Sequence, residues 1–190
     1  MLVTNSELEK FKQNKNISTN AQIRKDGFLL TLGNFIQTIN KDSSLFIDPF
    51  NEKDLDHFYG EKKSNWSNYM LEANEFILFS TNETFNMGNQ FFGLIITLTH
   101  VARLGIMTNL TSNYVDRYFE GELTLEVKNM TNHRFKLHKN MPVGKLIVFH
   151  LDTNNDEKLQ EKEGFTGAYR EKGELSSKYP QLFGVDLRGV

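Results

Sequence analysis

Hydrophobic and polar residues alternate along this chain in short runs, and the clearest pattern is that of a half-buried strand. In residues 122–128, leucine or valine takes every second position, and a charged residue or threonine takes the positions between. Successive side chains of a strand point to opposite faces, so this pattern predicts one buried face and one polar face. Further short apolar runs, separated by Asn, Gly, Asp and Ser clusters, predict more strands. The predicted strands are 28–32, 44–47, 76–80, 91–100, 122–128, 134–137 and 144–151.

A helical pattern is found near the N-terminus. Thr4 and Ser6 each precede a glutamate by three residues, and Leu8 and Phe11 follow at helical spacing. A hydroxyl residue followed three positions later by glutamate is typical of a helix start, because each side chain can bond the other's backbone N–H. A short capped helix that ends by Asn14 is therefore predicted.

Two segments depart from the β-rich pattern. Residues 51–68 are polar and charged around Trp66, which indicates a long excursion with a helical turn, or an insertion. The chain after Leu151 begins with charged and amide residues without periodicity and continues as a glycine-punctuated tail. We expect a single domain over residues 1–190, made of a helical N-terminal segment (1–26), a β core (27–151) and a C-terminal tail (152–190).

Composition excludes several classes of function. The 22 lysines and arginines nearly balance the 24 acidic residues, and a net charge of -2 gives no field that would hold a nucleic acid polymer. The absence of cysteine excludes disulfides, thiolate nucleophiles and Cys-based zinc sites. No segment approaches the roughly 20 apolar residues that cross a bilayer, so a cytoplasmic protein without a membrane partner is expected. His133, His138 and His150 lack metal-ligand spacing, and no metal site is predicted.

The most informative part of the chain lies between residues 97 and 151, where four motifs follow one another. They are Ala-Arg-Leu-Gly at 102–105, Val-Asp leading to Glu-Gly at 115–121, Leu-Glu-Val-Lys-Asn at 125–129, and Met-Pro-Val-Gly leading to Phe at 141–149. Their order and spacing resemble the dCTP deaminase family of the trimeric dUTPase superfamily. The resemblance covers most of residues 27–173. It implies a mainly β, dUTPase-like fold: a distorted β-barrel or jelly roll of antiparallel strands with a short N-terminal helix and few others.

The resemblance also implies a chemistry. Members of the family form homotrimers with sites between subunits, bind a pyrimidine deoxynucleotide (dCTP or dUTP), and hold magnesium through its phosphates without any zinc. In the family a glutamate takes a proton from the water that adds to C4 of cytosine and returns it to the leaving ammonia. Glu126 matches that glutamate. The strand pattern alone favours a solvated glutamate on a polar face, so both interpretations stay open.

Other family positions supply the remaining site candidates. Arg103 matches an arginine whose planar guanidinium can fix a carboxylate or carbonyl, and Thr99 takes the place of the motif's first serine. Three of the candidates also have a structural interpretation: a salt bridge for Arg103, a local turn cap for Asp116, and simple packing for His100. Catalytic candidates are thus Glu126, Arg103 and Thr99; substrate-binding candidates are His100, Asn109, Asp116, Tyr169 and Lys172.

Departures from the family pattern leave other functions open. Leu98 stands where the family has a phosphate-binding basic residue, and Leu29 and Thr31 stand where it has aspartate and arginine. Each lost charge-assisted contact is worth roughly 1.5–3 kcal/mol, so a standard triphosphate site would be weakened by orders of magnitude. One alternative is a catalytically inactive nucleotide-binding or regulatory protein. A second is a dUTPase, although the glycine-rich tail of that enzyme is absent.

Overall fold

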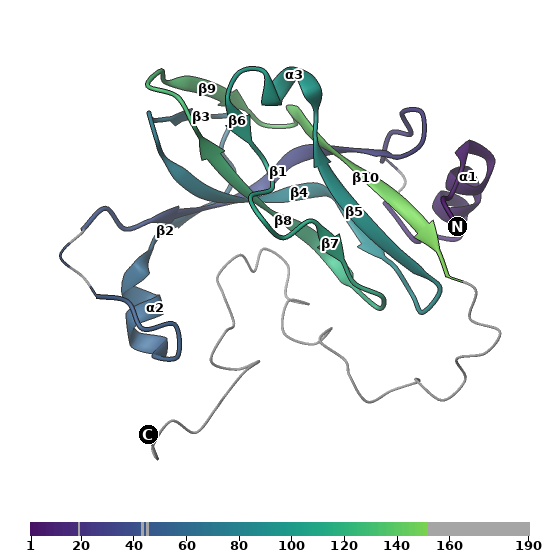
Figure 1. Ribbon diagram of the computed structural model, residues 1–190, viewed down its shortest axis with the longest axis horizontal. Coiled ribbons are helices and arrows are strands. Elements are labelled where there is room, and N and C mark those ends of the chain that lie inside the picture. Colours follow the sequence, from purple (N-terminus) through teal and green to yellow (C-terminus); the bar gives the residue numbers. More distant parts are fainter. Residues whose placement is uncertain (19, 43, 45, 152–190) are drawn as a thin grey trace, which may run out of the picture.

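The computed structural model describes residues 1–18, 20–42, 44 and 46–151. Within them, antiparallel strands form most of the structure, and three short helices lie at its periphery (Figure 1). The elements in chain order are α1 (Asn5–Gln13), β1 (Phe28–Ile39), α2 (Glu52–Phe58), β2 (Tyr59–Lys63), β3 (Asn68–Leu71), β4 (Phe76–Asn86), β5 (Phe91–Thr97), α3 (Thr99–Ala102), β6 (Ile106–Met107), β7 (Tyr114–Val115), β8 (Glu120–Asn129), β9 (Phe135–His138) and β10 (Pro142–His150).

The main sheet is organised around β1. Its strand order is β6-β8-β4-β1-β10-β5-β7, with β2 also paired to β1, while β3 and β9 form a separate pair. The first part of β1, Phe28 to Thr31, pairs with β10, and the part from Leu32 onward pairs with β4 and β2. The register shifts between Leu30 and Thr31 and again between Leu32 and Ile36. Such irregularities bend a strand, so the sheet curls into a half-barrel, and the predicted mainly β, distorted-barrel fold is confirmed.

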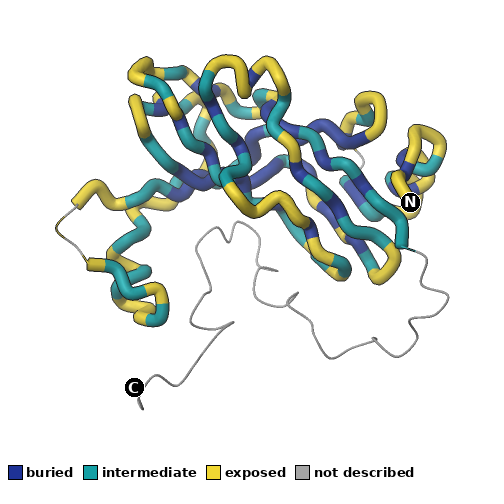
Figure 2. Tube along the Cα trace, viewed as in Figure 1, coloured by how far each residue is buried: buried dark blue, intermediate teal, exposed yellow. Residues whose placement is uncertain are grey.

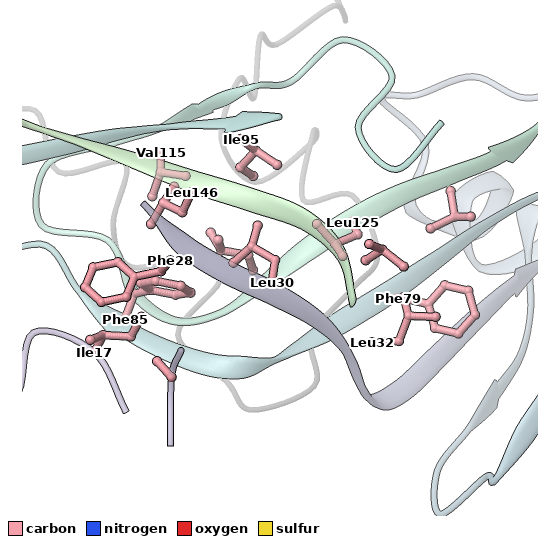
Figure 3. Packing of buried hydrophobic residues seen from close by; sticks show 14 of the residues in the cluster. Ile17, Phe28, Leu30, Leu32, Phe79, Phe85, Ile95, Val115, Leu125 and Leu146 are labelled. Carbon is pink, nitrogen blue, oxygen red and sulfur yellow. The ribbon is translucent and has the colours of Figure 1, made fainter. Parts of the chain in front are cut away.

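The hydrophobic core lies on one side of the curled sheet (Figure 3). Phe28, Leu30 and Leu32 project from β1 into this core and are fully buried, beside side chains of β4, β8 and β10. Burying each of these side chains contributes about 1.5–3 kcal/mol. This core is the main force that holds the strands in their order.

The predicted alternation of β8 is confirmed. Leu123, Leu125 and Val127 are at most 4% exposed, while the residues between them are partly exposed. Glu126 therefore lies on the outer face of a strand whose other face is fixed in the core.

The predicted N-terminal helix is also confirmed as α1. The Thr4 backbone N–H donates to Glu7 Oε2 at 2.9 Å, and the helix ends at Gln13. Leu8 and Phe11 are buried, and the Phe11 ring packs edge-on against Phe91 with centroids 5.0 Å apart. The helix thus covers the core near the start of β5.

The predicted strand over residues 44–47 is wrong. Of its described residues, Ser44 lies in a turn and Phe46 and Ile47 lie in no regular element. Asp42 Oδ1 accepts hydrogen bonds from both the backbone N–H and the hydroxyl of Ser44, which closes a local turn. Phe46 is 87% exposed, so its hydrophobicity reflects no buried face. A short apolar run is weak evidence for a strand where Asp and Ser side chains can bond the backbone.

The predicted strand over residues 91–100 is only partly right. β5 ends at Thr97, and Thr99 and His100 belong to the short helix α3 rather than to a strand. The backbone N–H of Leu98 still donates to Val143 O at 3.0 Å, and the N–H of Ala102 then bonds back to Leu98 O. The chain turns at this point into a helix, which the β-prone residue types of the segment conceal.

Residues 51–68 contain the predicted helical turn, α2, and the unpredicted strand β2. Gln37 Nε2 donates to Gly60 O at 2.7 Å, and Trp66 Nε1 donates to Gly33 O at 3.0 Å, so β1 holds the middle and the C-terminal part of this segment. The central residues of β2 are exposed (Figure 2). A strand without a buried face carries no alternating hydrophobic pattern, which is why the sequence did not predict it.

Candidate functional site

The Ala-Arg-Leu-Gly motif forms the end of α3 and the tight turn that follows it. Gly105 has φ of +75°, and a Cβ there would lie 2.4 Å from Thr131 Cγ2. Its carbonyl accepts a hydrogen bond from Met130 N at 2.8 Å. Only glycine combines this backbone conformation with so close an approach. The turn leads directly into β6, which pairs with the end of β8, so α3 is fixed relative to the strand that carries Glu126.

Three predicted site residues lie on α3 or directly after it. Thr99, His100 and Arg103 are all exposed. Within the described residues the Arg103 guanidinium forms no ion pair and no side-chain hydrogen bond, so the structural salt bridge considered for it is not seen there. These three side chains are accessible to a ligand.

Glu126 lies on the outer face of β8, and its carboxylate reaches a neighbouring loop. Its Oε2 atom accepts hydrogen bonds from the backbone N–H groups of Leu110 at 3.1 Å and of Thr111 at 3.3 Å. Among the described residues, no hydrogen bond is formed to the other oxygen, Oε1. Within the described part of the chain, the carboxylate is therefore fixed through one oxygen, and the other oxygen has no hydrogen-bond partner.

The loop that holds Glu126, residues 108–113, is joined to the end of β5. The Thr97 hydroxyl donates to Asn109 Oδ1 at 2.6 Å, and the Asn109 amide donates to Ile95 O at 3.1 Å and to Asn113 Oδ1. This loop therefore connects the segment that leads into α3 with the strand that carries Glu126. Asn109 and Glu126, predicted from separate parts of the sequence, lie in one hydrogen-bonded region.

Asp116 lies apart from this region. It follows β7, and Val115 pairs with Gly93 near the start of β5, four residues before Thr97. At about 3.3 Å per residue, this separation is roughly 13 Å along the strand. Partial desolvation raises the pKa of the Asp116 carboxyl although the residue as a whole is exposed. Asp116 thus follows the residue that pairs with Gly93, whereas the loop that holds Glu126 is attached to β5 at Ile95 and Thr97.

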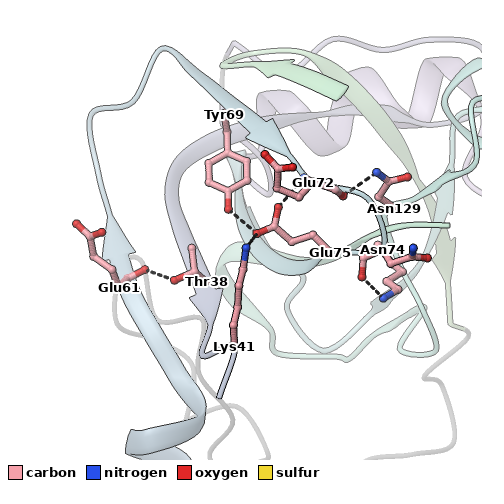
Figure 4. A network of polar contacts seen from close by, with 9 residues as sticks. Thr38, Lys41, Glu61, Tyr69, Glu72, Asn74, Glu75 and Asn129 are labelled. Atoms are coloured by element: carbon pink, nitrogen blue, oxygen red, sulfur yellow. Dashed lines mark hydrogen bonds and ion pairs between the residues drawn. The ribbon is translucent and has the colours of Figure 1, made fainter. Parts of the chain in front are cut away.

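The last residue of the Leu-Glu-Val-Lys-Asn motif is structural. Asn129 is fully buried, and its amide donates to Glu72 O and His133 O, both at 2.7 Å. Figure 4 shows this contact beside the Glu75 carboxylate, which accepts from the Tyr69 hydroxyl at 3.0 Å. Burial, together with the nearby Glu75, raises the Tyr69 pKa. This network anchors the end of β8 and thereby the strand of Glu126.

Sequence analysis missed a second carboxylate, Glu83 on β4. It is 4% exposed, and it accepts hydrogen bonds from Thr31 N at 2.9 Å and Thr31 Oγ1 at 2.7 Å. No ion pair to it is formed within the described part of the chain, and burial raises its pKa. The β4–β8 register shifts between Ser80 and Thr84, and residues of both parities are buried in β4, so a two-residue period could not have placed Glu83 from the sequence.

The apolar replacements of charged family residues take part in packing. Leu29 is 8% exposed, and Leu98 is partly buried against the core. Neither offers a charge to a ligand. The predicted contacts Tyr169 and Lys172 lie outside the described residues.

No helix in the described part of the chain is long and apolar enough to cross a membrane. Among the residues described, no group of three or more His, Cys, Asp or Glu side chains is placed so that it could hold a metal ion.

Comparison with known proteins relates the chain to one family. A family model described as "dCTP deaminase-like" matches residues 3–151. A dCTP deaminase, dUMP-forming, from Salinispora tropica is 28% identical over 131 residues, which cover 69% of this chain and 68% of the relative. The enzyme of the same description from Tropheryma whipplei is 29% identical over 124 residues, covering 65% of this chain and 63% of the relative.

A solved structure shows the same fold. The crystal structure of 2'-deoxycytidine 5'-triphosphate deaminase from Agrobacterium tumefaciens superimposes with a TM-score of 0.61 at 12% sequence identity. The match covers 77% of this chain and 46% of that chain, so this chain spans less than half of that protein.

Proposed function

Because the chain belongs to the dCTP deaminase-like family, we propose that it is an enzyme that deaminates a pyrimidine deoxynucleotide, with dCTP as substrate. The observation that carries the proposal is the Glu126 carboxylate. It is held through Oε2 by two backbone N–H groups and leaves Oε1 without a partner among the described residues. A general acid/base needs this combination of fixed position and an accessible oxygen.

In this proposal Glu126 takes a proton from the water that attacks C4 of cytosine and returns it to the departing ammonia. Thr99 and Arg103, exposed at α3, orient the water and the base edge. Hydroxyl and guanidinium groups suit these roles because one can both donate and accept, and the other presents a planar set of donors. His100 and Asp116 are proposed as substrate contacts, together with Tyr169 and Lys172 of the tail. Asn109, also predicted as a substrate contact, has its amide bonded to Thr97, Ile95 and Asn113, so this role is not proposed for its side chain.

Magnesium is proposed to arrive with the nucleotide, held by phosphate oxygens that this cation prefers. The described side chains provide no cluster of ligands for a metal of their own, so no residue is assigned to it and no step depends on it.

The proposed assembly is a homotrimer in the cytoplasm, with sites between subunits. Among the described residues no hydrogen bond joins Asp116 to Glu126 or to its loop, and this favours the arrangement, because a second copy can bring a further group to each site. Deamination alone gives dUTP and ammonia. The relatives are described as dUMP-forming, and dUMP as the product would require a second water that cleaves the phosphate chain and releases pyrophosphate.

A second candidate is a nucleotide-binding protein without catalysis. The packing of Leu98 and Leu29 favours it, because side chains that contribute to the core cannot supply phosphate-binding charge. Under this alternative the fold and Glu126 persist while the triphosphate is held weakly.

The test is to incubate the purified protein with each pyrimidine deoxynucleotide and magnesium, and to separate the products by ion-exchange chromatography. Turnover of dCTP to dUTP or dUMP by the wild type, reduced about 10²- to 10⁴-fold in Glu126→Gln, would support the enzyme and the role of Glu126. Binding of dCTP without turnover would support the second candidate. Turnover of dUTP alone, to dUMP and pyrophosphate, would show that the protein is a dUTPase and would rule out the proposed deamination.

A further inference from the structure

Thr97, the last residue of β5, makes more polar contacts than a strand end requires. Its hydroxyl donates to Asn109 Oδ1 at 2.6 Å, accepts from the Thr108 backbone N–H at 3.3 Å, and lies 3.0 Å from the Thr108 hydroxyl. Thr108 is fully buried. One hydroxyl thus fixes both the backbone and the side chains at the start of the 108–113 loop.

The Asn109 side chain extends this contact across the loop. Its Oδ1 accepts the hydrogen bond from the Thr97 hydroxyl, and its amide N–H groups donate to Ile95 O and Asn113 Oδ1. The backbone N–H of Ile95 donates to Asn113 O at 2.8 Å, so both ends of the loop are attached to β5. The hydrogen-bonding groups of the Asn109 amide are therefore used inside the protein.

The residues that follow Asn109 are those that hold Glu126. The N–H groups of Leu110 and Thr111 point at Oε2 of the carboxylate from a backbone whose position is set by the amide of Asn109. Glu126 is 17 positions from Asn109 and lies on β8, whereas Asn109 lies in a loop attached to β5, so the orientation of Glu126 depends on where β5 places this loop.

We propose that Thr97 and Asn109 are positioning residues, which set the 109–111 backbone and through it the Glu126 carboxylate. The catalytic consequence of this inference rests on the proposed function. The structural coupling between Thr97, Asn109 and the Glu126 carboxylate does not depend on that function. It also gives Asn109 a role that differs from direct contact with substrate. The expected signature is a loss of kcat with KM unchanged, because a displaced acid/base weakens the transition state rather than ground-state binding.

The coupling is tested first without activity. In protein labelled with ¹⁵N-leucine and ¹⁵N-threonine, the amide signals of Leu110 and Thr111 are compared with and without the substitution Glu126→Gln. In the wild-type background this substitution should move both signals, because the two N–H groups then donate to a neutral amide oxygen in place of a carboxylate. Thr97→Val removes the hydroxyl at nearly constant shape, and in that background Glu126→Gln should move the two signals less. Thr97→Ser keeps the hydroxyl and should restore the full change.

A matched control is Thr84→Val, because Thr84 is an exposed strand residue on β4 away from the loop. It should leave both amide signals and kcat as in the wild type. If Glu126→Gln moves the two amide signals as far in the Thr97→Val background as in the wild type, the positioning role is wrong, whether or not the wild type is active. Thermal unfolding of each variant checks that the comparison is between folded proteins.

Kinetics give the catalytic half of the test. We expect Thr97→Val to lower kcat for dCTP by about 10- to 100-fold, since small misplacements of a catalytic group have effects of this size. KM should stay within about twofold, and Thr97→Ser should recover most of kcat. A rise in KM with kcat unchanged would instead make this region a substrate contact. An inactive wild type would remove the proposed function but leave the amide measurement decisive for the coupling.

Discussion

Two glutamates on neighbouring strands, Glu126 of β8 and Glu83 of β4, are held in opposite ways. Glu126 is partly exposed and uses one oxygen on two loop N–H groups. Glu83 is buried, and both of its oxygens accept from Thr31 of β1. Among the described residues, Glu126 therefore keeps one oxygen without a hydrogen-bond partner, whereas both oxygens of Glu83 accept hydrogen bonds.

The difference shows how the same residue type serves chemistry in one place and the fold in another. Thr31 lies at the register shift between β1 and β10, where its backbone N–H needs an acceptor that the ladder does not provide. Glu83 supplies that acceptor from across the sheet. A buried backbone N–H without a partner is costly, so this carboxylate stabilises the bend that curls the sheet.

Truncating each glutamate to alanine should give the largest difference in stability between the two sites. Glu83→Ala leaves the Thr31 N–H and hydroxyl without their acceptor, and we expect a loss of about 1–3 kcal/mol in the free energy of unfolding. Glu126→Ala should lose less than about 1 kcal/mol, because water can reach the N–H of exposed Thr111. Urea unfolding followed by circular dichroism measures both. Equal losses would show that burial does not distinguish the two sites.

A smaller effect should follow from the amide that supports the Glu83 region. Asn82 Nδ2 donates to Thr31 Oγ1 at 3.0 Å, Leu32 O at 3.1 Å and Asn140 Oδ1 at 2.7 Å. Asn82→Ala removes these bonds and should cost about 0.5–1.5 kcal/mol. The control Asn132→Ala, at an exposed loop position, should stay within about 0.5 kcal/mol of wild type in the same urea titration. Indistinguishable variants would contradict a supporting role for Asn82.

The parts of the fold that sequence predicts are those where one local pattern decides the outcome. β8 alternates strictly and α1 begins with a capping pair, and both are found as predicted. The predicted strand over residues 91–100 ran into α3 because Thr97 and Thr99 are β-prone. The bond from the Leu98 N–H to Val143 O still belongs to the pairing with β10, and the helix begins where the Ala102 N–H bonds back to Leu98 O. A helix of four residues is too short to show a helical periodicity in the sequence.

The candidate site also has a part that the sequence predicted and a part that it could not predict. Family motifs and strand parity placed Glu126 on the outer face of β8, and the structure has it there. Its contacts with Leu110 and Thr111 could not be predicted, because they depend on how β5 presents a loop from outside the strand. Glu83 was missed because the predicted strand ended at Ser80, whereas β4 continues to Asn86 through an irregularity between Ser80 and Thr84.

The smallest expected effect is the pH dependence that Glu83 adds to stability. Burial raises the pKa of the folded-state carboxyl above its ordinary value of 4.5, so the folded protein binds this proton more tightly than the unfolded chain does. The contribution is fully present below the ordinary value and is lost as pH rises through the folded pKa. Glu83→Gln keeps the side-chain shape and an acceptor for Thr31 but cannot titrate. We therefore expect the unfolding free energy of wild type minus that of Glu83→Gln to decrease as pH rises from about 4.5 and then to level off.

This difference isolates Glu83 from the other carboxyls. Hydrogen bonds from the Thr4 backbone lower the pKa of Glu7, and those from Ser44 lower the pKa of Asp42, so these groups act in the opposite direction, but equally in both proteins. Urea titrations at a series of pH values on both proteins measure the difference directly. A difference that rises with pH would mean that Glu83 is stabilised as the anion, and that a positive charge reaches it in the folded protein. A flat difference would mean that the hydrogen bonds from Thr31 offset the desolvation of the charge.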